Sequence, residues 1–200
     1  MAVKVLMVDV DGVVLVHPDP RGWSVHLERD LGLTYDALQS AFFQPHFGEI
    51  IHGRAGLRER LGPVLREIAP HLTCDQLIDY WFSNDAHVNV SLLQELDQAR
   101  GRGLKLHLAT VQEHERADFI WRTLGLQKRF DAIHYAAELG WAKPEPEFYL
   151  EIERRSGFRP SEIFFIDDKI ENVEAARGCG WGAAVWTGAN TLEELLEKAG

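Results

Sequence analysis

The stretch that most constrains the fold is an apolar run at residues 3–8, which is rich in β-branched side chains. Such a run predicts a strand buried on both faces of a sheet. Asp9 and Asp11 follow two residues apart, so a continuing strand would place both carboxylates on one face, with Gly12 directly after them. Burying two unpaired carboxylates in apolar surroundings costs several kcal/mol, so the pair needs a cation or an open strand end. A simple turn is the weaker interpretation, because a turn needs only one Asp.

The rest of the chain alternates between strand and helix patterns. Further strand patterns occur at residues 104–109, 130–135, 162–166 and 182–186. Helical patterns lie between and beside them at residues 91–102, 113–124, 146–156 and 170–179. A Thr-Leu-Glu-Glu capping box at residues 191–194 opens a last helix. This alternation predicts an α/β fold, with a parallel sheet of about five strands and helices on both of its faces.

Between the first two strand patterns the sequence is helical only. An amphipathic stripe runs over residues 54–68, and Thr34 and Thr73 are suited to cap two further helices. About 70 residues of helix are too many for a single crossover connection. We therefore expect an inserted, all-helical subdomain at residues 17–88 and a core made of residues 1–16 and 89–200.

Composition and charge exclude several classes of protein. The chain has 200 residues and is 46% hydrophobic, enough to bury a core. Lys and Arg number 21 against 31 Asp and Glu, a net charge of −10 that disfavours nucleic-acid and anionic-membrane partners. Two cysteines in unrelated contexts give no disulfide framework, so a reducing, cytoplasmic location is expected. Asp9 and Asp11 interrupt the apolar N-terminus before a signal peptide could form, and no apolar run approaches transmembrane length.

Polar side chains of interest follow four of the strand patterns. They are Asp9 and Asp11 after the first, Thr110 after the second, Lys143 in the loop after the third, and Asp167 and Asp168 after the fourth. In an open parallel sheet, ligands bind beyond the carboxyl ends of the strands, where the strand order switches. Convergence of four strand ends on one edge predicts a single site.

The residue types at this edge suit phosphoryl chemistry. Converging carboxylates repel each other unless a cation joins them, and oxygen-only ligands favour a hard ion such as Mg²⁺. Asp9 is then a candidate nucleophile, and Asp11 a candidate acid and base. Thr110 and Lys143 offer donors for phosphoryl oxygens. Backbone amides around Asp11 and Gly12 are expected to add an anion nest.

Four segments, in chain order, resemble the motifs of the haloacid dehalogenase-like (HAD) hydrolase superfamily. They are Asp-Val-Asp-Gly-Val-Val at residues 9–14, Thr110, Gly-Trp-Ala-Lys-Pro-Glu-Pro at 140–146, and Phe-Ile-Asp-Asp-Lys-Ile-Glu-Asn at 165–172. The helical insert lies where the phosphatase branch of this superfamily carries its type-one cap. The resemblance implies a Rossmann-like core with a helical cap over residues 17–88.

The same resemblance implies a Mg²⁺-dependent phosphatase that hydrolyses a small organic phosphate ester, such as a sugar phosphate or a phosphoglycolate-like compound. Asp9 would attack phosphorus to give an aspartyl-phosphate, with Asp11 as acid and then base. Thr110 and Lys143 would hold the phosphoryl group. No nucleic acid or membrane is expected as a partner, and the chain is expected to be a monomer or homodimer.

For the metal, the resemblance implies the Asp9 carboxylate and the Asp11 backbone carbonyl as ligands. Asp168 aligns with the third ligand, and its neighbour Asp167 is expected at the metal site too, either bound to the metal or directly behind a ligand. Val111 departs from the family pattern, because many relatives carry Asn after the second-motif Thr or Ser. That substitution removes one side-chain contact to phosphate.

Three other functions stay open at this stage. A dehalogenase of the same fold is disfavoured by Asp11, which those enzymes lack. A sugar phosphomutase would share all four motifs, and a non-catalytic regulatory or scaffold protein would share the fold. A phosphatase is the favoured alternative because hydrolysis needs only water and every reactive position is filled.

The remaining polar residues favour ordinary structural roles. His107 and His134 fall in strand patterns, where packed neutral histidines are expected rather than metal ligands. His52 lies in the insert, where a solvated position is favoured over contact with a substrate at the interface between insert and core. Glu113 is expected on a charged helix face shared with the acids at residues 115 and 118.

Overall fold

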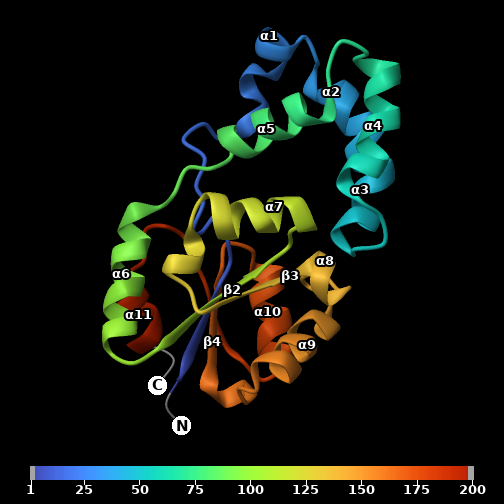
Figure 1. Cartoon of the computed structure of the whole chain (residues 1–200). Coiled ribbons are helices and arrows are strands. Elements are labelled where there is room, and N and C mark those ends of the chain that lie inside the picture. Colours follow the sequence, from blue (N-terminus) through green and yellow to red (C-terminus); the bar gives the residue numbers. More distant parts are fainter. Residues whose placement is uncertain (1–2, 198–200) are drawn as a thin grey trace.

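A five-stranded parallel sheet forms the base of the molecule in the computed structural model, which describes residues 3–197 (Figure 1). The strands are β1 (Val5–Val8), β2 (Lys105–Thr110), β3 (Ala132–Tyr135), β4 (Ile163–Asp167) and β5 (Gly182–Val185). Their order is β3-β2-β1-β4-β5, and every neighbouring pair is parallel. The expected fold class is confirmed.

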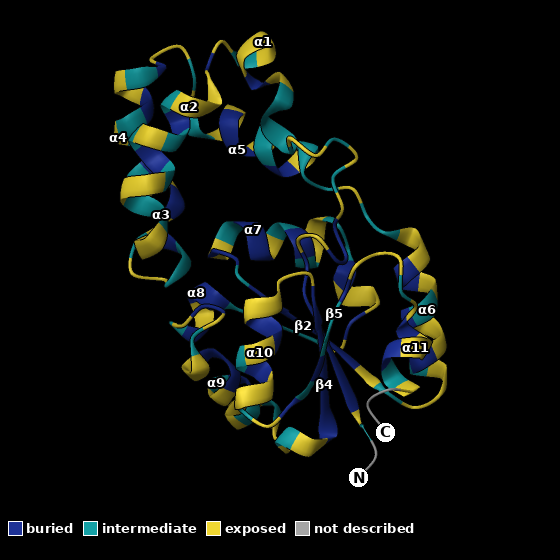
Figure 2. Ribbon diagram, turned by 180° about the vertical axis from the view of Figure 1, so that it is seen from behind, coloured by how far each residue is buried: buried dark blue, intermediate teal, exposed yellow. Residues whose placement is uncertain are grey.

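Helices cover both faces of the sheet, and its inner strands β1 and β4 are buried along their whole length (Figure 2). Leu6 and Val8 of β1 belong to a hydrophobic cluster with α6 (Val90–Gly101) and α11 (Leu192–Glu197). Val5 and Met7 belong to a second cluster on the other face. That cluster includes residues of α8 (Ala136–Leu139), α9 (Pro146–Ser156) and α10 (Ile170–Gly178). Alternate side chains of one strand thus fill two cores, which explains why the run is apolar throughout.

The strand order reverses beside β1. The chain builds outward from β1 through β2 to β3, then crosses back to add β4 and β5 on the other side of β1. β1 and β4 are in register with Val8 opposite Ile166, and the Asp9 amide donates to the Ile166 carbonyl at 3.0 Å. The carboxyl ends of β1 and β4 therefore lie side by side at the switch point, where α/β sheets bind ligands.

A helical insertion follows β1 and has a hydrophobic cluster of its own. It contains a 3-10 turn (Trp23–His26), α1 (Leu27–Leu31), α2 (Tyr35–Leu38), a π-helical segment (Gln39–Phe43), α3 (Gln44–Ile51), α4 (Leu57–Ile68) and α5 (Cys74–Asn84). Thr34 and Thr73 cap α2 and α5 as expected. The stripe predicted from residue 54 becomes helical only at Leu57, because Gly56 before it has an extended backbone and is the N-cap of α4.

The insertion contacts the core on two sides. On one side it meets α7 (His114–Asp118) and the π-helical segment Phe119–Thr123, which lie between the sheet and the insertion (Figure 1). There the Arg58 guanidinium donates to Glu115 at 2.8 Å, and the rings of Phe82 and Phe119 lie 5.4 Å apart. On the other side Gly53 packs so closely on α8 that a Cβ atom would overlap the Ala137 carbonyl.

Two linking segments join the insertion to the core and pair with each other. The Val16 amide donates to His87, and the Asn89 amide donates to Val14, each at 2.8 Å. The expected boundaries at 16/17 and 88/89 fall within this pair, although the division into two domains stays a prediction. Within residues 3–197 there is no helix with the length and apolarity needed to cross a membrane.

Candidate active site

The structure places all six predicted site residues at the carboxyl edge of the sheet. Thr110 and Asp167 are the last residues of β2 and β4, and Asp9 directly follows β1. Asp9, Thr110, Lys143 and Asp167 are buried, whereas Asp11 and Asp168 are exposed. The site therefore has a shielded floor and two accessible carboxylates.

Lys143 connects three strand ends. Its ammonium lies 2.7 Å from Asp9 Oδ1 and 2.6 Å from Asp167 Oδ2, and it donates to the Ala109 carbonyl at 3.0 Å. It also lies 5.2 Å from the centre of the Phe165 ring. These contacts join the ends of β1, β2 and β4 in surroundings where charge–charge interactions are strong.

The site carries an excess of negative charge. One carboxylate oxygen from each of Asp9, Asp167 and Asp168 lies within 4.8 Å of the others. Burial raises the pKa of Asp9, with Lys143 opposing the shift and Asp167 adding to it. Burial and the charge of Asp167 likewise raise the pKa of Asp168. One ammonium among three carboxylates leaves negative charge that a bound cation would offset.

Asp167 and Asp168 have different surroundings. Asn172 Nδ2 lies 3.0 Å from both oxygens of Asp167, and the Lys169 amide donates to Oδ1 at 2.8 Å. Together with Lys143, these donors use the lone pairs of Asp167. Asp168 is exposed and lies against Gly12, so it is the acid of this pair that is open to a ligand.

Gly12 is needed for close approach. Its φ is 81°, and a Cβ atom there would overlap the Asp168 carboxylate. The expectation of an anion nest is wrong at this residue, because the Gly12 amide already donates to the Leu15 carbonyl at 2.8 Å. The tight loop after β1 uses that donor to close itself.

Asp11 is held apart from the other acids. Its carboxylate is not in the cluster of Asp9, Asp167 and Asp168; instead Oδ2 accepts a 2.6 Å hydrogen bond from Gln112 Nε2. The same nitrogen lies 3.5 Å from Thr110 Oγ1. Asp9 and Asp167 thus contact Lys143 directly, and Asp168 lies beside them. Asp11 and Thr110 are instead linked through Gln112, a residue that the sequence pattern does not single out.

A family model described as haloacid dehalogenase-like hydrolase matches residues 3–180. The chain belongs to this family. It is 30% identical over 99 residues to a phosphorylated carbohydrates phosphatase of Thermotoga maritima, covering 50% of this chain and 46% of that protein. The bifunctional epoxide hydrolase 2 of Rattus norvegicus is 25% identical over 100% of this chain and 39% of its own length. The chain thus spans less than half the length of these two relatives.

Solved structures show the same fold. A HAD family enzyme of Bacteroides thetaiotaomicron, solved in complex with magnesium and inorganic phosphate, matches with a TM-score of 0.80 at 19% identity. The match covers 97% of this chain and 99% of that one, so the helical insertion is included. This agrees with the HAD resemblance of the four sequence motifs.

The position of Glu113 differs from the one expected for it in this HAD hydrolase. It is buried rather than part of a solvated helix face, and its carboxylate accepts from the amides of Glu115 and Arg116. Burial raises the pKa of this carboxyl, while the two amides oppose the shift. Glu113 is the N-cap of α7.

Arg116 is a buried residue that joins α7 to the end of α5. It donates to the carbonyls of Phe82, at 3.0 Å, and Asp85, and it forms an ion pair with the Asp85 carboxylate at 3.2 Å. Burial raises the pKa of Asp85 to about 6, opposed by Arg116. The segment that leads from the insertion back to the core is therefore fixed on the core side.

The histidines fall into two groups. His107 and His134 are buried neighbours on β2 and β3, with Nδ1 of the first 3.1 Å from Nε2 of the second. Burial lowers the pKa of His134 to about 4, so the packed neutral pair is confirmed. His52 departs from the solvated position expected for it, because its Nε2 lies 3.2 Å from Glu145 Oε2 in the core.

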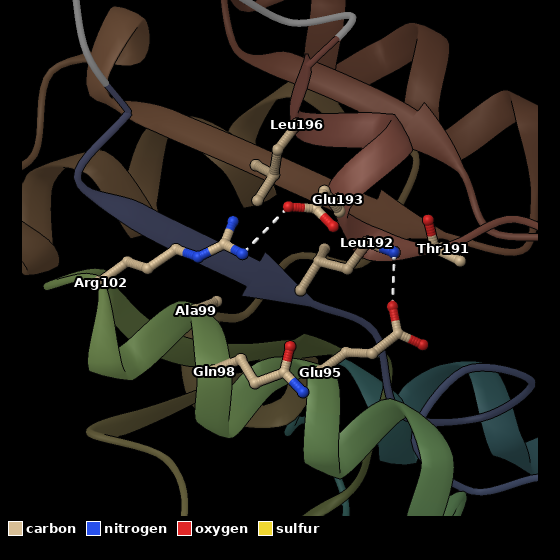
Figure 3. A pocket seen from close by; sticks show the side chains of 8 residues that line it. All are labelled: Glu95, Gln98, Ala99, Arg102, Thr191, Leu192, Glu193 and Leu196. Atoms are coloured by element: carbon tan, nitrogen blue, oxygen red, sulfur yellow. Dashed lines mark hydrogen bonds and ion pairs between the residues drawn. The ribbon is translucent and has the colours of Figure 1, made fainter.

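Two hollows in the surface bear on where a ligand would bind. One of about 310 Å³ lies between α6 and α11, where Arg102 pairs with Glu193 and Glu95 accepts from the Leu192 amide (Figure 3). Its charged groups are thus already paired. Another of about 550 Å³ is lined by Gly12 and Asp168, together with Val16, Val88, Asn89, Val90 and residues 186–188. The second hollow adjoins the acidic cluster.

Proposed function

We propose that this HAD hydrolase is a Mg²⁺-dependent phosphatase that cleaves a small organic phosphate ester through an aspartyl-phosphate on Asp9. The observation that carries the proposal is the group at the switch point, where Asp9 contacts Lys143 at 2.7 Å beside two further acids. The Thermotoga relative is named a phosphorylated carbohydrates phosphatase, which favours a sugar phosphate or a phosphoglycolate-like ester as substrate. Asp11 disfavours a dehalogenase.

The donor set fits a hard cation. All three clustered side chains offer carboxylate oxygens, and they carry more negative charge than Lys143 offsets. Asp9, Asp168 and the Asp11 backbone carbonyl would hold Mg²⁺, with Asp167 beside them. A bound Mg²⁺ supplies positive charge that draws phosphate oxygens to the site and polarises the phosphorus–oxygen bonds.

The side chains divide the work of two displacement steps. In the first, an oxygen of Asp9 attacks phosphorus while Asp11 gives a proton to the departing ester oxygen. In the second, Asp11 takes a proton from water as that water attacks phosphorus and frees Asp9. Lys143 and Thr110 donate to phosphoryl oxygens in both steps.

The helical insertion would act as a cap. Its contacts with α7 and with Glu145 support a position over the carboxyl edge of the sheet (Figure 1). A cap in this position excludes bulk water and selects the leaving group. Four further points stay predictions. They are a substrate small enough to fit beneath the insertion, a cytoplasmic location, a monomeric or homodimeric state, and the absence of nucleic-acid and membrane partners.

The deciding experiment is phosphate release from p-nitrophenyl phosphate and a panel of sugar phosphates and phosphoglycolate, with Mg²⁺ and with EDTA. We expect release that requires the metal and disappears in Asp9→Asn. Release that persists in Asp9→Asn would contradict the aspartyl-phosphate. Absence of release, together with phosphate transfer between two positions of a sugar phosphate, would indicate a phosphomutase instead.

A further inference from the structure

Gln112 is a buried polar residue just beyond β2. Its side chain is 6% exposed, and its backbone carbonyl accepts from the Ala137 amide at 3.1 Å. Its amide nitrogen lies 2.6 Å from Oδ2 of Asp11 and 3.5 Å from the Thr110 hydroxyl. A shielded, anchored amide thus holds one oxygen of an exposed carboxylate.

This contact matters because of what Asp11 must do. An exposed carboxyl rotates freely about its side-chain bonds, yet a general acid and base must keep one oxygen aimed at the reacting atom. The Gln112 amide can only donate through nitrogen, so Oδ2 of Asp11 must accept. Oδ1 of Asp11 is therefore the oxygen that Gln112 leaves free.

We propose that Gln112 is the positioning residue for Asp11, fixing the orientation of its carboxyl group and leaving Oδ1 free to face the reacting atoms. The inference rests on the proposed phosphatase function. In the first step the Asp9–phosphorus bond forms, the ester bond breaks, and the proton on Oδ1 passes to the leaving oxygen. In the second step water attacks phosphorus, Oδ1 takes a proton from that water, and the Asp9–phosphorus bond breaks.

The local sequence agrees with this assignment. Val111, between Thr110 and Gln112, has no polar side chain. Gln112 lies two residues after Thr110, which puts both side chains on the same face of an extended chain. The side-chain amide of Gln112 donates to Asp11, which is 101 positions away in the sequence, rather than to the nucleophile Asp9.

A comparison of two substrates distinguishes a residue that positions an acid and base from one with a merely structural role. p-Nitrophenolate leaves without a proton, whereas the alkoxide of glycerol 2-phosphate needs one. In Gln112→Met we expect kcat/KM for glycerol 2-phosphate to fall by about 10- to 100-fold. For p-nitrophenyl phosphate we expect kcat/KM to change by less than about threefold. Its kcat should fall by about 10- to 100-fold, because water attack then limits turnover.

Rapid mixing gives an independent measure of the same effect. Gln112→Met should release a burst of p-nitrophenol approaching one per site, followed by slow turnover. Gln112→Glu keeps the shape, and while its carboxyl is ionised it has no proton to donate to Asp11, so above neutral pH it should show the same division between substrates. Gln98→Met makes the same change at an exposed position of α6 and should behave as wild type.

The outcomes that overturn the inference are distinct from those that overturn the proposed function. If Gln112→Met and Gln112→Glu lose kcat/KM equally for both substrates, Gln112 does not position Asp11. The same conclusion follows if neither substrate shows a loss. Thermal melting of each variant identifies loss through unfolding, and Gln112→Glu then carries the test. A wild-type protein that releases phosphate from neither ester would instead contradict the phosphatase proposal.

Discussion

The Lys143 ammonium lies 2.6 Å from the Asp167 carboxylate, and the two side chains are 1% and 0% exposed. Asp9 and Asp167 raise the pKa of Lys143 against the opposing effect of its burial. The lysine is thus a charged link between strand ends, in addition to its proposed role as a donor to phosphate. Its removal should affect stability and activity together.

Lys143→Met should lower the unfolding free energy by about 3 kcal/mol in EDTA, because two buried carboxylates lose their partner. It should also lower kcat by about 10²- to 10³-fold. Urea unfolding and ester hydrolysis measure the two effects. Lys4→Met, which breaks an ion pair whose lysine is 61% exposed, is the control and should cost less than about 1 kcal/mol. A similar loss of stability in both variants would contradict the structural role of Lys143.

Asp167 and Asp168 should respond differently to the same substitution. Asp168→Asn removes an exposed carboxylate, so we expect about a tenfold or greater rise in the Mg²⁺ concentration needed for activity and little change in stability. Asp167→Asn removes a fully buried acceptor of Lys143, Asn172 and the Lys169 amide, so it should destabilise the fold by about 1–3 kcal/mol. Activity measured over a range of Mg²⁺ concentrations tests the first effect, and urea unfolding tests the second. The reverse pattern would exchange the roles assigned to the two acids.

The sequence predicts the sheet and the edge that carries the candidate site, because both depend on local signals. Runs such as residues 3–8 are apolar on both faces, and polar residues follow directly where those runs end. Parallel strands then bring Asp9 and Asp167 together without any further information. The loop that carries Lys143 is predicted by its motif.

The residues that the sequence does not reveal depend on distant neighbours. Glu113 reads as a surface acid beside other charges, and only the start of α7 at His114 makes it a cap. Gln112 and Arg116 are polar residues without a pattern until folding brings them to Asp11 and to the carbonyl of Phe82, which are 101 and 34 positions away. Pairings at such separations are set by tertiary packing and leave no periodic trace.

His52 and Glu145 form a contact between the insertion and the core that should affect closure more than stability. The Glu145 carboxylate accepts from the Ala142 amide and lies 3.2 Å from His52 Nε2, and both donors lower its pKa. His52→Ala should lower kcat/KM by about three- to tenfold and the unfolding free energy by less than about 1 kcal/mol. In a double-mutant cycle, Glu145→Gln should add little to His52→Ala. Additive losses would show that the two side chains act separately.

The buried pair His107 and His134 should make the fold sensitive to acid. His134 has a pKa of about 4 in the folded chain against an ordinary value of 6.5, so the unfolded chain binds more protons between these pH values. The contribution of neutral His134 to the unfolding free energy is therefore complete above pH about 6.5. It is lost as the pH falls toward about 4, by up to roughly 3 kcal/mol. Burial also lowers the pKa of His107, with the same sign.

His134→Gln should therefore show a shallower loss of unfolding free energy than wild type between pH 6.5 and pH 4.5. Urea unfolding at several pH values gives both curves, and their difference cancels the carboxylates that also titrate in this range. His26→Gln alters an exposed histidine of the insertion and should run parallel to wild type. Parallel curves for wild type and His134→Gln would contradict the prediction, because the buried ring would then take up its proton as readily in the folded chain as in the unfolded one.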